Sequence, residues 1–349
     1  MAVSLGDLAV RFGCELRGDP QALIEHVGTL AGADARALTF FANPRYRQQL
    51  SATRAGAVVL DRRCADGCPT AALICENPYA TYARIAQILY PRPASPAGVH
   101  ASALIAASAQ IHPTAHVGAL ALIGERVVVG ARAFIGPHCL IEEDVVLAED
   151  VYLAARVTLC RAVAVGARTV MQPGAVIGGD GFGFAQDRGQ WLKIPQVGTV
   201  RIGADVEIGA NTTIDRGAIE DTVIGDDVKL DNLIQIGHNV RFGEHTAIAG
   251  CTGISGSTVI GRRCQIGGMV AMGGHLTIAD DVVITGASMI SRSITRPGVY
   301  SSGIPFEEAR AWRRLVAHFK RIGLISARVR KLERAAGAAE DPDQEEADD

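Results

Sequence analysis

Two histidines in the second half of the chain have a spacing that suits a shared active-site wall. His238 and His275 are 37 residues apart, and Gly256 lies 18 residues after His238. An imidazole can take up a proton near physiological pH, and a glycine N–H can donate a hydrogen bond to a developing oxyanion. Most single surface histidines are inert, so a catalytic hypothesis depends on a fold that brings these three residues together.

The element expected to position them is a six-residue repeat that runs through residues 99–290. Every sixth residue from Val99 to Ile177 is aliphatic or Met, and the series resumes at Ile202 and slips once before Ile224. Neither an amphipathic helix nor an alternating strand has this period, but a triangular coil of hexapeptides does. The repeated residues would point inward and fill a continuous core, with each coil contacting its neighbours.

A coil of about 18 residues, stacked at about 4.8 Å per coil, predicts that His238, Gly256 and His275 share one exposed flank. The two imidazoles would then lie roughly 10 Å apart. His245 falls one residue out of phase with His238, so we expect no metal site from these histidines. The chain also lacks a nucleophile elbow, which favours a single general base over a covalent relay.

Composition sets the broad class. The chain has 349 residues, a formal net charge of −3 and 48% hydrophobic residues, which fits two or three domains and argues against a general nucleic-acid binder. No signal peptide is recognisable at the start, and no apolar run is long enough for a transmembrane segment. The eight cysteines are scattered. Reduced thiols in a cytoplasmic protein are therefore expected.

The repeat divides the chain into four parts. Residues 1–98 lack it and read as an α/β domain, with a capped helix start at 4–9, buried strands at 55–60 and 71–75, and a helix at 79–89. Residues 99–298 form the coil, which a loop at 179–200 interrupts. Residues 299–335 form a helical extension, and residues 336–349 are small and acidic, so we expect them to be disordered.

An aromatic segment of the first domain has two interpretations. Phe40, Phe41 and Tyr46 lie within seven positions of one another, with Asn43 between them. The first interpretation is an aromatic mini-core with a turn at Asn43 and Pro44. The second is a ligand site in which two rings flank a flat base and Asn43 hydrogen-bonds to its edge.

The C-terminal extension is amphipathic and basic. Its apolar residues recur at helical spacing, and residues 310–334 carry nine Lys or Arg against one acid, Glu333. One interpretation is a solvated face that also packs in an oligomer, and the other is a docking surface for an acidic protein. The basic residues concerned are Arg310, Arg313, Arg314, Lys320 and Arg321.

The sequence resembles one family over about residues 3–335, the UDP-3-O-acylglucosamine N-acyltransferases of the lipid A pathway. A hexapeptide repeat alone is common to many acyltransferases, so the resemblance rests on five motifs in order. They are residues 38–46 (LTFFANPRY), 179–184 (GDGFGF), 211–217 (NTTIDRG), 237–239 (GHN) and 298–305 (GVYSSGIP). The resemblance implies a mainly β fold, namely a left-handed parallel β-helix of hexapeptide repeats with an N-terminal α/β domain and a C-terminal helix.

The resemblance also implies a reaction. A (3R)-3-hydroxyacyl chain would pass from phosphopantetheinylated acyl carrier protein to the 2-amine of UDP-3-O-(3-hydroxyacyl)-α-D-glucosamine, with no further cofactor. His238 would be the general base, Asp231 would orient it, and His275 would bind substrate or support the oxyanion together with the Gly256 N–H.

The family also implies positions for the substrates and partners. Phe40 and Tyr46 would sandwich uracil, Asn43 would bind its edge, and Met289 would face the acyl groove or simply pack. The protein would be a homotrimer, and its basic helix would meet the acyl carrier protein.

Two alternatives remain open at this stage. A UDP-N-acetylglucosamine O-acyltransferase of the same pathway shares the repeat but would lack the aromatic N-terminal domain. A non-enzymatic, metal-binding hexapeptide trimer would need three histidines converging across an interface.

Overall fold

The computed structural model describes residues 2–92, 95–303 and 306–336. The chain divides into two compact units, residues 1–94 and 95–349. The predicted acidic tail, apart from Ala336, and the last two residues of the 298–305 motif lie outside the described residues.

The first unit is an α/β domain built on a five-stranded sheet with strand order β2-β7-β6-β5-β4. Its strands are β1 (Val3–Ser4), β2 (Glu15–Arg17), β3 (Leu23–Ile24), β4 (His26–Val27), β5 (Ala37–Phe41), β6 (Ala57–Leu60) and β7 (Ala71–Ile74). Its helices are α1 (Leu5–Phe12), η1 (Pro44–Tyr46), α2 (Arg47–Ser51), η2 (Arg62–Gly67) and α3 (Pro78–Leu89). The predicted helices and strands of this unit are confirmed.

Both faces of this sheet are covered. Ala57 and Val59 of β6 are buried in one hydrophobic cluster together with residues of α1 and α3, and Val58 and Leu60 are buried in another. Alternate residues of a strand point to opposite faces, so an uninterrupted apolar strand needs a core on each side. Helix α1 begins where predicted, because the Ser4 hydroxyl accepts a hydrogen bond from the Asp7 N–H.

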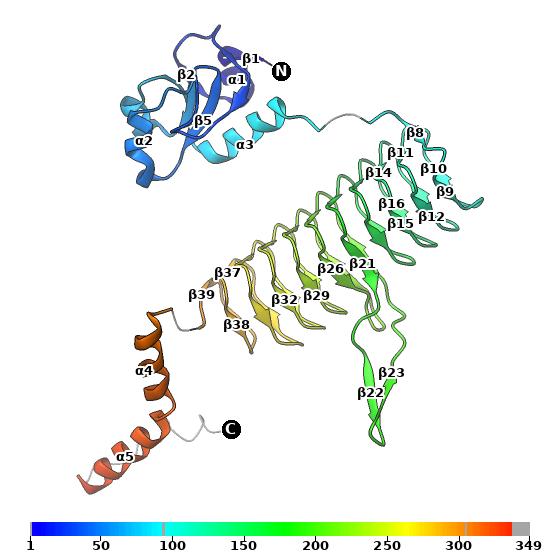
Figure 1. Cartoon of the computed structure of the whole chain (residues 1–349), viewed down its shortest axis with the longest axis vertical. Coiled ribbons are helices and arrows are strands. Elements are labelled where there is room, and N and C mark those ends of the chain that lie inside the picture. Colours follow the sequence, from blue (N-terminus) through cyan, green and yellow to red (C-terminus); the bar gives the residue numbers. More distant parts are fainter. Residues whose placement is uncertain (1, 93–94, 304–305, 337–349) are drawn as a thin grey trace. The chain divides into compact units, whose positions relative to one another are not determined.

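The second unit is a parallel β-helix of three sheets (Figure 1). Along each coil the chain visits the first, second and third sheets in turn, so we name the corners first–second, second–third and third–first. The first sheet contains β8 (Gly98–Val99), β11 (His116–Val117), β14 (Phe134–Ile135), β17 (Tyr152–Leu153), β20 (Val170–Met171), β25 (Glu207–Ile208), β28 (Lys229–Leu230), β31 (Ala247–Ile248), β34 (Gln265–Ile266), β37 (Val282–Ile284) and β39 (Gly298–Tyr300).

The other two sheets repeat this arrangement. The second sheet contains β9 (Leu104–Ile105), β12 (Leu122–Ile123), β15 (Leu140–Ile141), β18 (Thr158–Leu159), β21 (Val176–Gly179), β26 (Thr213–Asp215), β29 (Gln235–Ile236), β32 (Gly253–Ile254), β35 (Ala271–Met272) and β38 (Met289–Ile290). The third sheet contains β10 (Gln110–Ile111), β13 (Val128–Val129), β16 (Val146–Leu147), β19 (Ala164–Val165), β24 (Val200–Ile202), β27 (Thr222–Ile224), β30 (Arg241–Phe242), β33 (Val259–Ile260) and β36 (Thr277–Ile278).

The residues of the six-residue series fill the core of the β-helix, as the sequence predicted. Ile236 pairs with Ile254 and Ile254 with Met272 on successive coils, and all three are buried. The prediction fails at the open end, where Val99 is 50% exposed. Within this unit the first coil has a neighbouring coil on one side only, so its inward residue stays partly uncovered.

Two insertions leave this stacking intact. The coil resumes after residues 179–200 with Val165 paired to Ile202, and after residues 216–221 with Ile214 paired to Ile236. Both insertions lie at the second–third corner, on successive coils. The longer one contains an antiparallel hairpin of β22 (Phe184–Asp187) and β23 (Gln190–Lys193), which extends away from the coil (Figure 1).

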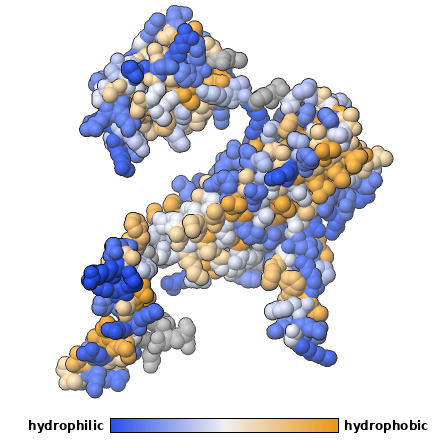
Figure 2. Space-filling model, in the orientation of Figure 1, coloured by the Kyte–Doolittle hydropathy of each residue, from blue (hydrophilic) through white to orange (hydrophobic). Residues whose placement is uncertain are grey.

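Apolar side chains are exposed on the longer insertion. Figure 2 shows them where the hairpin leaves the coil. They include Phe182, Phe184, Trp191, Leu192 and Ile194.

The C-terminal extension contains two helices where the sequence predicted one. Helix α4 (Ala309–Phe319) and helix α5 (Ile322–Ala335) are separated at Lys320 and Arg321. The backbone of Arg321 leaves helical geometry, with φ −101° and ψ 0°, and Gly323 just beyond is a weak helix former. Among the helices of the described residues, none has the length and apolar character that crossing a membrane requires.

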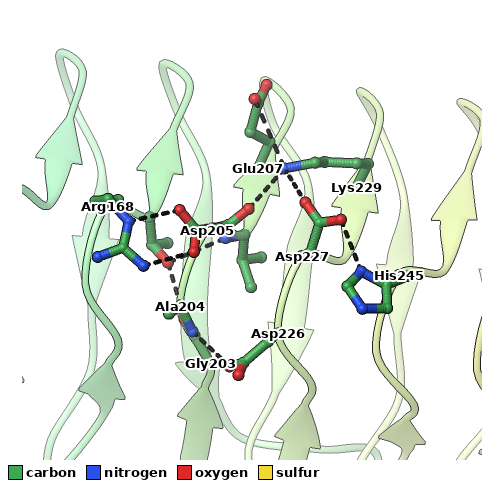
Figure 3. Close-up of polar contacts among 11 residues, drawn as sticks. Arg168, Gly203, Ala204, Asp205, Glu207, Asp226, Asp227, Lys229 and His245 are labelled. Carbon is green, nitrogen blue, oxygen red and sulfur yellow. Dashed lines mark hydrogen bonds and ion pairs between the residues drawn. The ribbon is translucent and has the colours of Figure 1, made fainter.

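Charged residues form a ladder along the third–first corner (Figure 3). Arg168 donates to both carboxylate oxygens of Asp205, at 2.7 and 2.6 Å. Lys229 bridges the Asp205 carbonyl oxygen, at 2.6 Å, and the Asp227 carboxylate, at 3.0 Å, and His245 contacts Asp227 at 2.9 Å. The same corner carries the ion pairs Arg132–Asp150 and Arg263–Asp281. His245 therefore belongs to a structural ladder.

Replacing Asp205 tests the contribution of this ladder. The hydrogen bond from Arg168 holds the pKa of Asp205 below its ordinary value, so its stabilisation is present above the ordinary carboxyl pKa and is lost as the pH falls below about 4. Both side chains are about half exposed, so the pair contributes about 0–1 kcal/mol. We expect Asp205→Asn to lower Tm by about 1–3 °C at pH 7, and the difference to be smaller at pH 3. A difference that is constant between these two pH values would contradict this account.

Candidate active site

His238, Gly256 and His275 lie at the second–third corner on three successive coils. The register that places them there pairs Gln235 with Gly253 and Gly253 with Ala271. The corner residues stack in the same register, because the His275 N–H donates to the carbonyl oxygen of Gly256 in the preceding coil at 3.0 Å. The three residues therefore share one flank, as the repeat predicted. His238 is half-buried and His275 is exposed.

The contacts of Asn239 define the tautomer of His238. The Asn239 Nδ2 donates to the Glu220 carbonyl oxygen at 2.7 Å, and its Oδ1 accepts from the Ala218 N–H at 3.0 Å. These two contacts fix which end of the amide is oxygen. The His238 Nδ1 lies 2.9 Å from that oxygen, so Nδ1 carries the proton and donates it. The Nε2 lone pair is left to act as a base.

Gly256 lies directly against the His238 ring. A Cβ added to Gly256 would stand 2.6 Å from His238 Nε2 and 2.7 Å from its Cε1, which is closer than atoms can approach. Any side chain at this position would push the ring away. Within the described part of the chain, the Gly256 N–H donates no hydrogen bond, so it is an open donor beside the base.

The longer insertion covers the other side of the His238 ring. A Cβ on Gly181 would lie 2.8 Å from His238 Cβ and 2.9 Å from the Gln196 Oε1, so the glycine of the GDGFGF motif allows this close approach. Lys193 holds the segment by an ion pair to Asp180 at 3.1 Å. Gln196 is only 6% exposed, and its Oε1 is the one buried side-chain nitrogen or oxygen of the described residues without a hydrogen-bond partner.

Asp215 is the carboxylate that interacts electrostatically with His238. It ends β26, one coil before His238, and accepts a hydrogen bond from Gln235 at 3.0 Å. Burial is the largest influence and raises the pKa of Asp215, whereas the Gln235 hydrogen bond and the charge of a protonated His238 oppose the rise. A charged Asp215 and a protonated His238 therefore stabilise each other.

The expected contact between Asp231 and His238 does not occur within the described chain. Asp231 follows β28 and so lies at the first–second corner. Its carboxylate accepts from the Asn232 N–H at 2.8 Å and from the Gly250 N–H at 2.9 Å. In one chain Asp231 cannot orient His238, because the two residues follow strands of different sheets; Asn239 does so instead.

The predicted nucleotide-binding residues lie at the carboxyl end of β5, in the parallel part of the first unit's sheet. Open α/β sheets usually bind ligands at this edge. Phe40 contacts Tyr82 and Tyr79, with ring centroids 4.5 and 5.1 Å away, and these two tyrosines were not anticipated. The Asn43 Oδ1 caps η1 by accepting from the Arg45 N–H at 3.0 Å.

Tyr46 is 45% exposed, and no ring contact joins it to Phe40 among the described residues. The ring contacts of Phe40 fit the mini-core interpretation, and the ligand-site interpretation stays a prediction. Phe40 packs inside an aromatic group, and Tyr46 and Asn43 remain exposed beside it.

The remaining predicted residues are also on the surface. Met289 of β38 is 74% exposed. The basic residues of α4 and of the following turn, Arg310, Arg313, Arg314, Lys320 and Arg321, are exposed. Among the described residues, no group of three or more His, Cys, Asp or Glu side chains is arranged to hold a metal ion.

Three residues of the His238 corner were missed by sequence reasoning. Asn239 and Asp215 lie inside the quoted GHN and NTTIDRG motifs, but nothing in those motifs assigns them a role. Gln196 lies within the predicted loop 179–200 but outside its quoted motif. Their proximity depends on coil register and on the path of the insertion, which the repeat alone does not encode.

Comparisons with known proteins identify one family. Residues 21–88 match the family model described as UDP-3-O-(3-hydroxymyristoyl) glucosamine N-acyltransferase, LpxD. A protein of Pseudomonas aeruginosa (strain UCBPP-PA14) named UDP-3-O-acylglucosamine N-acyltransferase is 47% identical over 97% of this chain and 96% of its own length. A protein of Hahella chejuensis with the same name is 45% identical over 98% of this chain and 99% of its own.

A solved structure is also similar. It is described as a UDP-N-acetylglucosamine acyltransferase, is 25% identical with a TM-score of 0.47, and covers 66% of this chain and 81% of its own.

Replacing Asp215 tests the electrostatics of this corner. Because the pKa of Asp215 is raised by burial, its contribution to stability is present below the ordinary carboxyl pKa and is lost as the pH rises through the raised value. At pH 7 the buried charge is therefore a cost. We expect Asp215→Asn to raise Tm at pH 7 and to give no gain near pH 4, measured by thermal unfolding. A variant that is less stable than the wild type at pH 7 would show that the charge is compensated.

Proposed function

Because the chain belongs to the UDP-3-O-acylglucosamine N-acyltransferase family, we propose that it performs this family's step of lipid A biosynthesis. It transfers a (3R)-3-hydroxyacyl chain from acyl carrier protein to the 2-amine of UDP-3-O-(3-hydroxyacyl)-α-D-glucosamine. The observation that carries the mechanism is the His238 corner, where Asn239 fixes the tautomer and Nε2 lies beside an open backbone donor.

The chemistry is a direct attack on the thioester. The amine lone pair adds to the carbonyl carbon, and His238 Nε2 takes one amine proton as the C–N bond forms. The tetrahedral intermediate then collapses, the C–S bond breaks, and the imidazolium returns its proton to the departing pantetheine thiolate. No covalent enzyme intermediate is needed, so His238 acts as base and then as acid.

Two groups stabilise the charges that develop. The Gly256 N–H, which has no partner among the described residues, donates to the oxygen of the tetrahedral intermediate. Asp215 offsets the charge of the protonated His238. His275 lies one coil beyond Gly256 and binds substrate or supports the same oxyanion.

The nucleotide binds at the carboxyl end of β5. Phe40 and Tyr46 supply ring faces for uracil, and Asn43 hydrogen-bonds to its edge, since its amide nitrogen makes no hydrogen bond within the described chain. This first unit separates the proposal from the O-acyltransferase alternative, which does not call for an aromatic domain.

The acyl donor supplies the remaining contacts. The acyl carrier protein is acidic in charge, and the exposed basic residues of α4 and its following turn, from Arg310 to Arg321, would meet it. Met289, exposed on β38, faces the acyl chain. We further propose that the protein is a cytoplasmic homotrimer, in which the exposed apolar residues of the longer insertion contact a second copy.

The direct test combines purified protein, 3-hydroxyacyl carrier proteins of several chain lengths, and the UDP-acylglucosamine acceptor, with products identified by mass. We expect one amide-linked acyl chain per acceptor. His238→Ala should lower kcat by about 10²–10⁴-fold without changing Tm, because the side chain lies outside the core. Turnover close to that of the wild type would exclude His238 as the base.

Phe40→Ala tests the nucleotide site. Loss of base stacking corresponds to about 1–3 kcal/mol, so we expect the KM for the nucleotide sugar to rise by about 5–150-fold and the KM for the acyl carrier protein to stay constant. Because Phe40 also packs on Tyr82, Tm is measured alongside. Unchanged kinetics in a folded variant would place the uracil elsewhere.

A further inference from the structure

Two cysteines of the first unit face each other across one end of its sheet. Cys14 directly precedes β2, and Cys75 directly follows β7. The two strands are antiparallel neighbours, with Glu15 opposite Ile74. The same register carried one residue further places Cys14 opposite Cys75. Both cysteines are half-buried, and both thiols are free.

The backbone hydrogen bonds show which kind of cross-strand pair these cysteines form. The Cys14 N–H donates to the Ala9 carbonyl oxygen at 2.9 Å, and the Cys75 N–H donates to the Leu60 carbonyl oxygen at 3.1 Å. The two cysteines therefore exchange no N–H···O bonds with each other. In an antiparallel pair of this type the Cα atoms are about 4.5 Å apart, and disulfides usually join Cα atoms about 4.4–6.8 Å apart. A disulfide thus fits this pair without moving either strand.

The two thiols also lie on the same face of the sheet. Cys14 and Cys75 pack against the hydrophobic cluster that contains Leu73, as Leu16 and Tyr82 do. Burial raises the pKa of the Cys14 thiol to about 11, and the neighbouring Cys75 adds to the rise. Because only a thiolate is a good nucleophile, Cys14 is protonated and slow to react at pH 7.

The other cysteines lack such a partner. They are Cys64, Cys68, Cys139, Cys160, Cys251 and Cys264. Among the described residues, none of these lies opposite another cysteine in a paired strand. Two of them are close in sequence, at the end of η2, where the Cys68 thiol donates to the Thr70 carbonyl oxygen at 3.5 Å. Cys14 and Cys75 are therefore the cysteines that strand pairing brings together.

We propose that Cys14 and Cys75 form a modification site, at which a small-molecule disulfide such as oxidised glutathione converts the two thiols into an intramolecular disulfide. In a reducing compartment the thiols stay free, and the bridge forms when the oxidant accumulates. This inference depends on the fold of the first unit alone, so it is independent of the proposed function.

The reaction consists of two thiol–disulfide exchanges. The thiolate of one cysteine attacks a sulfur of the small disulfide, which gives a mixed disulfide on the protein and releases one small thiol. The thiolate of the second cysteine then attacks the protein sulfur of the mixed disulfide, closes the bridge and releases the second small thiol. Two electrons and two protons pass from the cysteines to the small disulfide, and a dithiol reductant reverses the reaction.

The bridge would stabilise the first unit. It would join the end of α1, which Cys14 follows, to the start of α3, because Cys75 lies two residues before the N-cap Asn77. The chain between residues 14 and 75 contains most of the strands of this unit. A cross-link that closes so long a loop stabilises the folded state mainly by restricting the unfolded chain.

The test treats the folded, full-length protein with oxidised glutathione at mildly alkaline pH and then blocks the remaining thiols with iodoacetamide. We expect proteolysis and mass spectrometry to show one pair of peptides linked between Cys14 and Cys75. The midpoint temperature at which residues 2–92 become sensitive to protease should rise by about 5–15 °C. Dithiothreitol should reverse both changes.

Three variants make the test specific. Cys14→Ser and Cys75→Ser should form no linked pair and should show no rise in the midpoint temperature after oxidation. Cys64→Ser is the matched control, because it removes another half-buried thiol of the same unit, and it should behave as the wild type does. The midpoint of each reduced variant shows whether it is folded, and Cys14→Ala replaces Cys14→Ser if the serine variant unfolds.

Several results would overturn the proposal. Glutathione adducts on Cys14 or Cys75 that never close to a bridge would show that the thiols do not meet in the folded protein. A linked pair that forms only after unfolding in urea would exclude a bridge prepared by the fold. A lower midpoint temperature in the bridged protein would show that the strands must distort to accept it.

Discussion

The structure depends on one constraint, the parallel pairing of each coil with the next in a fixed register. Backbone hydrogen bonds between coils hold the inward aliphatic residues in columns, so Ile236, Ile254 and Met272 stack. Each outward position is then also part of a column. Two residues that are 18 positions apart in a regular part of the coil lie on the same edge in successive coils. Residues distant in sequence therefore come to lie beside His238.

The chain adds chemistry where it departs from the repeat without breaking the register. Both insertions leave and rejoin the coil at the second–third corner. Arg216 anchors them: it is buried, and its guanidinium donates to the Gly178 and Arg161 carbonyl oxygens at 3.0 and 2.5 Å. The coil therefore supplies a rigid platform that includes Asp215, and the longer insertion supplies Gln196 and the cover over His238.

Two edges of the prism use their polar groups differently. On the third–first edge, Arg168, Asp205, Lys229 and Asp227 pair with one another in the ladder. On the second–third edge, within the described residues, the Gly256 N–H beside the His238 ring has no acceptor. The paired side chains add to the stability of the coil, whereas an open donor next to a base is free to bind a ligand oxygen.

The sequence by itself determined the β-helix, because a six-residue period of aliphatic residues fits neither an amphipathic helix nor an alternating strand. It also determined the shared flank of His238, Gly256 and His275, because the register between coils follows from that period. Only the tertiary structure decided which groups touch the imidazole. Asp231 is closer in sequence to His238 than Asp215 is, yet Asp215 is on the strand stacked beneath it. Asn239 reaches His238 through its side-chain rotamer, and Gly181 reaches it through the path of the insertion. Those features depend on contacts between segments, and the repeat does not specify them.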